Sequence, residues 1–175
     1  MCQAASGLAA VHDQGIVHRD IKSANMFVTS QDELKVMDFG LAKGSEAAGG
    51  KSKKGHGLTQ EGFLAGTPNY IAPEQIRSFA HATHLADIYS LGVVAYEMFT
   101  GSLPFENDEL MGLLVMHMTE TPQPPRERNP QIPQELNDLI LRMLEKAPDA
   151  RVQTCHQIVS AVRAMPGFPP RVACR

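Results

Sequence analysis

Four polar residues near the start of the chain have the types and the spacing that phosphoryl transfer requires. Asp20 can orient a hydroxyl group, and Lys22, two positions later, can meet a phosphate. Asn25 and Asp38 lie thirteen positions apart, and their carboxamide and carboxylate oxygens can share a metal ion. Because phosphoryl transfer depends on metal ions and on a nucleophile held in line, this set indicates that chemistry.

Three short runs of the chain resemble motifs of the protein kinase family. Residues 18–25, 38–40 and 66–74 are HRDIKSAN, DFG and GTPNYIAPE, and they resemble the catalytic loop, the metal-binding turn and the end of the activation segment. The resemblance extends from residue 2 to about residue 164. Three motifs in the right order are a specific signal, whereas any one of them alone would be weak.

The resemblance implies a role for each of the polar residues. Asp20 resembles the catalytic aspartate that takes the proton of the substrate hydroxyl, and Lys22 resembles the lysine that neutralises the transferring phosphate. Asn25 and Asp38 resemble the ligands of Mg²⁺. Phe27 stands where the family usually has a leucine beneath the adenine ring. The implied cofactors are therefore ATP and Mg²⁺, with Lys22, Asn25, Phe27 and Asp38 as the binding residues.

The implied substrate is a serine or threonine of a protein. Lys22 and the glycine-threonine-proline run before Tyr70 resemble serine/threonine kinases rather than tyrosine kinases. Ser23 and Ala24 stand where many kinases that prefer basic substrates have proline and glutamate. The sequence preference of the substrate therefore remains open.

The resemblance also implies regulation by phosphorylation. Arg19 resembles the arginine that binds a phosphorylated residue of the activation segment. Thr59 lies at about the position of the regulatory acceptor, and Thr67 resembles the threonine that contacts the catalytic aspartate and lysine. Ser45 and Ser52 stay open as acceptors, and an unmodified polar loop residue is the alternative for each of these hydroxyls.

Five further residues are expected to hold the site together. His18 and Phe39 resemble the pair that ties the metal-binding turn to the catalytic loop. Asp87 resembles the aspartate that hydrogen-bonds the backbone of that loop, although a helix N-cap is the alternative for its side chain. Glu74 and Arg151 resemble a buried ion pair that anchors the activation segment, and breaking such a pair costs several kcal/mol.

The elements that must position these residues are mostly helices. Apolar periodicity predicts helices at residues 2–13, 86–100, 108–117, 134–145 and 154–164. Short strands are expected at 16–17, 26–28 and 34–37, and the last two form a hairpin. Residues 43–62 indicate a glycine-rich loop, and the proline-rich stretch 121–133 is expected to be extended.

The fold class that follows is mainly α, a kinase-like C-terminal lobe with a few short strands near the catalytic loop. We expect a partial kinase domain at 1–165, with the activation segment at 38–74 and a disordered tail at 166–175. Residues 1–17 contain neither the glycine-rich loop nor the strand lysine that hold ATP in the family. We therefore expect the N-terminal lobe in a longer chain and little activity from these residues alone.

Two functional classes remain in view. One is a serine/threonine protein kinase whose activity belongs to the longer chain, and the other is a non-catalytic, pseudokinase-like binding module. The intact set of Asp20, Lys22, Asn25 and Asp38 favours the kinase, because a binding module has no physical need for it.

Composition excludes several other classes of protein. The net charge of −3 and the pI of about 6.1 provide no cationic field for nucleic acid. Three widely spaced cysteines indicate neither a disulfide framework nor a zinc site. No stretch approaches the roughly 18 apolar residues of a membrane span. We expect a globular protein of a reducing, cytoplasmic setting.

Overall fold

The computed structural model describes residues 1–38, 68–79 and 82–166. This part is mainly helical, with one two-stranded sheet, as predicted. In chain order the elements are α1 (Cys2–His12), η1 (Ser23–Asn25), β1 (Met26–Val28), β2 (Leu34–Val36), η2 (Pro68–Tyr70), α3 (Pro73–Arg77), α4 (His84–Thr100), α5 (Leu110–Thr119), α6 (Pro125–Arg128), α7 (Gln134–Met143), η4 (Pro148–Ala150) and α8 (Cys155–Ala164). The expected loop at 43–62 and most of the expected tail lie outside the described residues, and the domain limits stay predictions.

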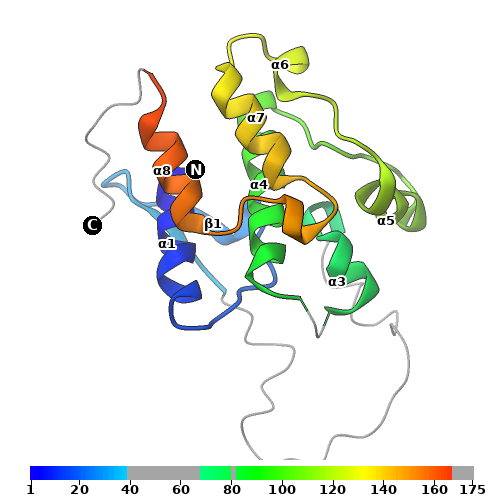
Figure 1. Ribbon diagram of the computed structural model, residues 1–175, viewed down its shortest axis with the longest axis horizontal. Coiled ribbons are helices and arrows are strands. Elements are labelled where there is room, and N and C mark those ends of the chain that lie inside the picture. Colours follow the sequence, from blue (N-terminus) through cyan, green and yellow to red (C-terminus); the bar gives the residue numbers. More distant parts are fainter. Residues whose placement is uncertain (39–67, 80–81, 167–175) are drawn as a thin grey trace, which may run out of the picture.

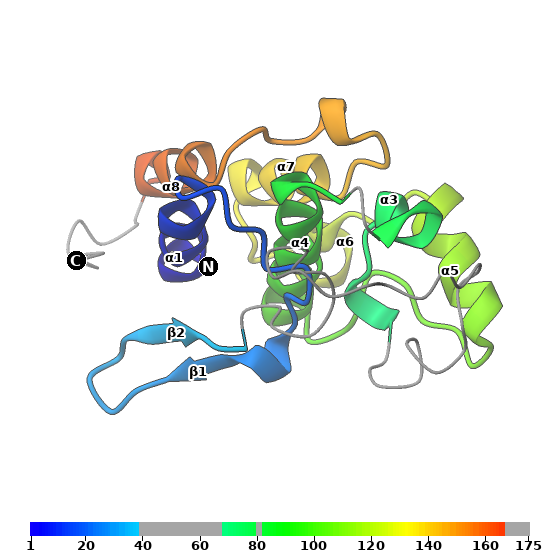
Figure 2. The ribbon, with the colours of Figure 1, turned by 90° about the horizontal axis from the view of Figure 1, so that it is seen from below.

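Helix α4 lies at the centre of the molecule, with α1 and α8 on one side, α7 along it and α3 and α5 on the other side (Figures 1 and 2). Residues 86–96 are all buried, because this helix is apolar around most of its circumference. It begins after Thr83, whose hydroxyl accepts the Leu85 N–H, and ends at Gly101 in the left-handed conformation (φ 76°). A Cβ on Gly92 would lie 2.9 Å from Met143 Cβ, so glycine permits the close contact between α4 and α7.

A hydrophobic core cluster joins α1, α4, α7 and α8. Leu8, Ile88, Met143 and Ile158 are fully buried in it. Ile21, which lies between α1 and η1, is buried in the same cluster. Core packing therefore fixes the middle of the loop that carries Asp20 and Lys22.

The hairpin of β1 and β2 extends away from the helices (Figure 2). The strands pair antiparallel in the register Met26↔Val36, Phe27↔Lys35 and Val28↔Leu34. The side chain of Gln3, on α1, accepts the Leu34 N–H at 2.7 Å and donates to the Asp32 carbonyl at 3.1 Å. The hairpin is thus tied to α1, and it joins the loop after α1 to Asp38.

The predicted strand at residues 16–17 is wrong. The Ile16 N–H donates to the Val11 carbonyl at 3.0 Å, and Gly15 has a φ of 72°. These features are typical of a helix C-terminus and not of a β-strand, so Ile16 belongs to the C-terminal turn of α1.

The prediction of an extended stretch at 121–133 is also wrong in part, because residues 125–128 form the short helix α6. Pro125 stands at its first position, where a missing N–H costs nothing. The Asn137 carboxamide of α7 accepts the Arg126 N–H at 3.1 Å. A side chain eleven residues away thus satisfies the first turn, which a local pattern does not reveal.

The remaining predicted helices are confirmed to within a few residues at their ends. Among the described residues, no helix combines the length and the apolar character that a membrane crossing requires.

Candidate active site

The loop between α1 and β1 brings Asp20, Lys22 and Asn25 together. The Lys22 ammonium lies 2.8 Å from Asp20 Oδ2. The Asn25 amide nitrogen donates to the Asp20 carbonyl at 3.0 Å and to Asp20 Oδ2 at 3.3 Å. The Asp20 side chain remains 57% exposed, and its Oδ1 has no partner among the described residues. A solvent-facing carboxylate oxygen beside a cation is suited to accept a hydrogen bond from a hydroxyl group.

Asp87 of α4 holds the start of this loop. Its Oδ2 accepts the His18 N–H at 2.8 Å, and its Oδ1 accepts the Arg19 N–H at 2.7 Å. His12 of α1 adds a contact of 2.8 Å from its Nε2 to Oδ2. The side chain of Asp87 is buried, and Thr83, not Asp87, is the N-cap of α4. A buried carboxylate with three donors is a strong local anchor.

The backbone of Arg19 is held in a strained conformation. Its φ of 66° lies in the left-handed region, which a long side chain seldom adopts. The Arg19 N–H is fixed by Asp87, and the Arg19 carbonyl accepts from Gln75 Nε2 at 3.0 Å. Gln75 lies in α3, so the segment that begins at residue 68 contacts the loop that carries Asp20 directly. The Arg19 Nε is buried and has no acceptor among the described residues.

Asn25 and Asp38 offer the oxygen atoms for a metal ion. Asn25 uses its amide nitrogen on Asp20, which leaves its Oδ1 without a partner among the described residues. The Met37 N–H donates to the Asn25 carbonyl at 2.9 Å, so Asp38 follows directly after a residue bound to Asn25. The exposed Asp38 has a φ of 57° and no partner within the described part of the chain. A carboxamide and a carboxylate oxygen fit Mg²⁺.

His18 links the loop to the residue before Asp38. Its Nδ1 accepts the Asp20 N–H at 3.3 Å, so the ring proton lies on Nε2, which donates to the Met37 carbonyl at 2.9 Å. The imidazole is fully buried and faces two backbone groups. It therefore positions the two halves of the site and does not face solvent. Phe39, its expected packing partner, lies outside the described residues.

Glu74 and Arg151 form a bidentate ion pair. The Arg151 Nη1 and Nη2 each lie 2.7 Å from a Glu74 carboxylate oxygen. The Arg151 side chain is 0% exposed and also donates to the carbonyls of Leu85, Glu145 and Lys146. The pair ties α3 to the start of α4 and to the segment before η4.

Three residues near the site were missed by the sequence analysis. The Ser23 and Tyr70 hydroxyls lie 2.8 Å apart, and the Tyr70 hydroxyl donates to Glu97 Oε2 at 2.7 Å. Burial raises the pKa of Tyr70, the Ser23 hydroxyl opposes the rise, and Glu97 reinforces it. These residues are 47 and 27 positions apart along the chain, so no local pattern could reveal the contact.

The other expected site residues are not part of this cluster. Phe27 lies on β1 with its side chain 55% exposed. Thr59 and Thr67 lie outside the described residues.

Arg19 lines a cavity of about 360 Å³ together with His12, Gly15, Ile16, Val17, Ala82, Thr83 and His84.

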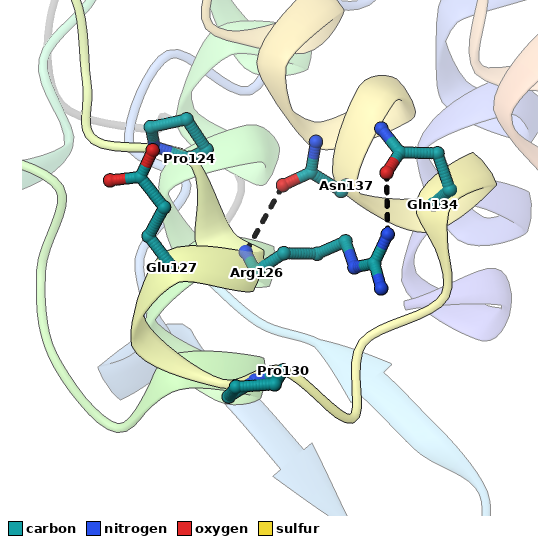
Figure 3. A pocket seen from close by; sticks show the side chains of 6 residues that line it. All are labelled: Pro124, Arg126, Glu127, Pro130, Gln134 and Asn137. Carbon is teal, nitrogen blue, oxygen red and sulfur yellow. Dashed lines mark hydrogen bonds between the residues drawn. The ribbon is translucent and has the colours of Figure 1, made fainter.

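A second cavity, of about 350 Å³, lies between α6 and α7 (Figure 3). Its lining includes Arg126, which donates to Gln134 Oε1 at 2.6 Å, and the two prolines Pro124 and Pro130. It contains none of the predicted site residues, so the candidate site remains the loop around Asp20.

Comparison with known proteins identifies the family of the chain. The model of the protein kinase domain matches residues 1–162. The chain belongs to the protein kinase family. This kinase chain is 38% identical over 169 residues to the serine/threonine-protein kinase pkn3 of Myxococcus xanthus, covering 93% of the chain and 30% of pkn3. It is 36% identical over 170 residues to the serine/threonine-protein kinase PknB of Mycolicibacterium smegmatis, covering 97% of the chain and 26% of PknB.

A solved structure shares the fold of this kinase chain. The crystal structure of Rad53 1-466 in complex with AMP-PNP superposes with a TM-score of 0.68 at 25% identity, covering 91% of the chain and 38% of Rad53. The kinase chain spans less than a third of the length of pkn3 and of PknB. The predicted family and the predicted mainly helical fold are confirmed.

Proposed function

We propose that the chain supplies the catalytic loop of a serine/threonine protein kinase, which transfers the γ-phosphoryl group of ATP to a serine or threonine of a protein. The observation that carries the proposal is the cluster around Asp20, whose Oδ2 lies 2.8 Å from the Lys22 ammonium and 3.3 Å from the Asn25 amide nitrogen. The relatives support the acceptor class, because they are serine/threonine-protein kinases.

In the proposed reaction, Asp20 accepts a hydrogen bond from the acceptor hydroxyl and finally its proton. The hydroxyl oxygen forms a bond to the γ-phosphorus, the bond to the β–γ bridging oxygen breaks, and ADP leaves with that electron pair. Lys22, 2.8 Å from Asp20, stabilises the charge of the transferring group. Asn25 and Asp38 would hold Mg²⁺, which neutralises the charge of the phosphate oxygens.

We propose that Arg19 binds a phosphate group on the activation segment, with Thr59 as the acceptor. The support is its buried Nε, which has no acceptor among the described residues, and the adjoining cavity of about 360 Å³. Thr67 is proposed to contact Asp20 and Lys22, and the exposed Phe27 to face the adenine ring.

These 175 residues are proposed to transfer no phosphate by themselves. A kinase also holds ATP through a glycine-rich loop and a strand lysine paired with a helix glutamate, and residues 1–17 contain no such loop. A non-catalytic binding module is the second candidate, and the exposed Leu110, Met111 and Val115 of α5 favour it.

A chimaera separates the two candidates. Residues 1–165 are joined to the ATP-binding lobe of Myxococcus xanthus pkn3, in place of the matching part of pkn3. We expect transfer of labelled phosphate from ATP to serine or threonine, and a loss of about 10²–10⁴-fold in kcat for Asp20→Asn. A folded chimaera without transfer, or with transfer that Asp20→Asn leaves intact, contradicts the kinase proposal and favours the binding module.

The proposed metal ligands, Asn25 and Asp38, are tested in the 175-residue chain without the added lobe. Mn²⁺ binding, followed by electron paramagnetic resonance, is expected to weaken in Asp38→Asn and Asn25→Ala. Asp32→Asn is the matched control, because Asp32 is also exposed and also has a φ of 57°. Equal affinities of the Asp38 and Asp32 variants contradict the assignment of Asp38.

A further inference from the structure

The middle of the catalytic loop has a contact that the family motif does not assign. Ser23 lies between Lys22 and Asn25, in η1. Its hydroxyl lies 2.8 Å from the Tyr70 hydroxyl of η2, which in turn lies 2.7 Å from Glu97 of α4. The three side chains therefore form a bridge between the loop, the segment that follows residue 67 and the central helix.

The direction of the hydrogen bonds in this bridge follows from the available protons. Tyrosine has one hydroxyl proton, and Tyr70 donates it to the Glu97 carboxylate. The Ser23 hydroxyl is therefore the donor to the Tyr70 oxygen. Hydrogen bonds that run in one direction toward a carboxylate polarise one another, which strengthens each of them.

The position of the bridge gives it a specific task. Asp87 holds the loop at His18 and Arg19, and Ile21 is buried in the core. Beyond Ile21, the hydrogen bond between the Ser23 and Tyr70 hydroxyls joins η1 to η2. Tyr70 is held to α4 at two points. Its hydroxyl donates to Glu97, and its carbonyl accepts from the Ser90 hydroxyl at 2.7 Å.

We infer that Ser23 is a positioning residue, which holds Lys22 and Asn25 in their working arrangement through the bridge to Tyr70 and Glu97. The inference rests on the proposed kinase function for its meaning, but the bridge itself is testable without activity. Proline or alanine at position 23 has no hydroxyl and cannot close the bridge. The loop of this chain is therefore coupled to the placement of Tyr70, at the end of the proposed activation segment.

Native-state hydrogen exchange of the 175-residue chain tests the inference. The Asn25 and Met26 amides donate to the carbonyls of Lys22 and Ser23 within η1, and they report its opening. We expect Ser23→Ala and Tyr70→Phe each to raise exchange at these two amides about 2- to 10-fold, the equivalent of one net hydrogen bond. The double variant is expected to add nothing further, and Ser23→Thr, which keeps the hydroxyl, is expected to restore the slow exchange.

The matched control is Ser30→Ala, an exposed serine in the hairpin turn, which should leave the η1 amides unchanged. Unchanged exchange in Ser23→Ala overturns the inference. An equal rise at all amides, including those of α8, also overturns it, because that result means global destabilisation. Mn²⁺ binding serves as a second measurement and is expected to weaken several-fold in Ser23→Ala but not in Ser30→Ala. A wild-type chain that binds no Mn²⁺ contradicts the proposed function and leaves the exchange result to decide the bridge.

Discussion

Two buried charged clusters hold the candidate site, and they are built in opposite ways. The first surrounds the carboxylate of Asp87 with donors, namely the backbone N–H groups of His18 and Arg19 and the imidazole of His12. The second surrounds the guanidinium of Arg151 with the Glu74 carboxylate and three carbonyl groups. Both clusters satisfy a buried charge, and the second does so with a bidentate ion pair.

The second cluster also contains two further basic side chains, Lys146 and His117, whose positively charged forms are disfavoured there. Burial and the neighbouring Arg151 lower the pKa of Lys146 to about 8. Burial and Lys146 in turn lower the pKa of His117 to about 4. The Lys146 ammonium lies 4.2 Å from the centre of the Phe105 ring, which partly compensates for its burial. Crowded cations therefore make this cluster sensitive to both mutation and pH.

Removal of Arg151 is expected to have the largest effect on stability. Arg151→Met leaves the Glu74 carboxylate and three carbonyls without their donor, and we expect a loss of about 3–5 kcal/mol in the free energy of unfolding. Urea denaturation at neutral pH measures it. Arg142→Met, an exposed arginine of α7, is the control and should change stability little. A loss below about 1 kcal/mol would show that the ion pair is not an anchor.

The pH dependence of stability is expected to depend on His117. Its pKa is about 4 in the folded chain and near 6.5 when unfolded. The unfolded chain therefore binds more protons between these values, and stability falls as the pH drops from about 6.5 to 4, by roughly 3 kcal/mol. Urea denaturation across this range should give a shallower slope for His117→Gln than for the wild type. His156→Gln, at an exposed histidine, is the control, and equal slopes in both variants would contradict the prediction.

Asp87→Asn tests the first cluster and is expected to cost less. The asparagine amide would face one of the two backbone N–H groups and leave it without an acceptor, a loss of about 2 kcal/mol. Exchange of the His18 and Arg19 amides should rise together with the drop in stability. Asp108→Asn, at an exposed aspartate, provides the comparison. A drop in stability without faster exchange at these two amides would locate the effect elsewhere.

Local patterns predicted the elements and the motif residues but not the contacts that join distant parts. The periodicity of α4 and the spacing of Asp20, Lys22 and Asn25 are properties of short stretches, and the structure has both. The helix α6 depends on Asn137, and the bridge depends on Tyr70 and Glu97, which lie far from Ser23 in the chain. Such contacts follow from the packing of whole helices, so a single sequence does not reveal them.

Tyr89→Phe is expected to have the smallest effect and the most specific one. The Tyr89 hydroxyl lies 2.9 Å from His117 Nδ1, and its oxygen also accepts from the Lys146 ammonium at 3.5 Å, which favours the hydroxyl as the donor to the imidazole. This bond stabilises the neutral imidazole, and its removal should cost about 1 kcal/mol at neutral pH. The pKa of His117, followed by NMR of its ring protons, should then rise toward 6.5. Tyr96→Phe is a suitable control, because its hydroxyl has no hydrogen-bond partner among the described residues. If Tyr89→Phe leaves the pKa of His117 unchanged, burial and Lys146 alone account for the low pKa. The Tyr89 hydroxyl then contributes nothing to the difference between the two clusters.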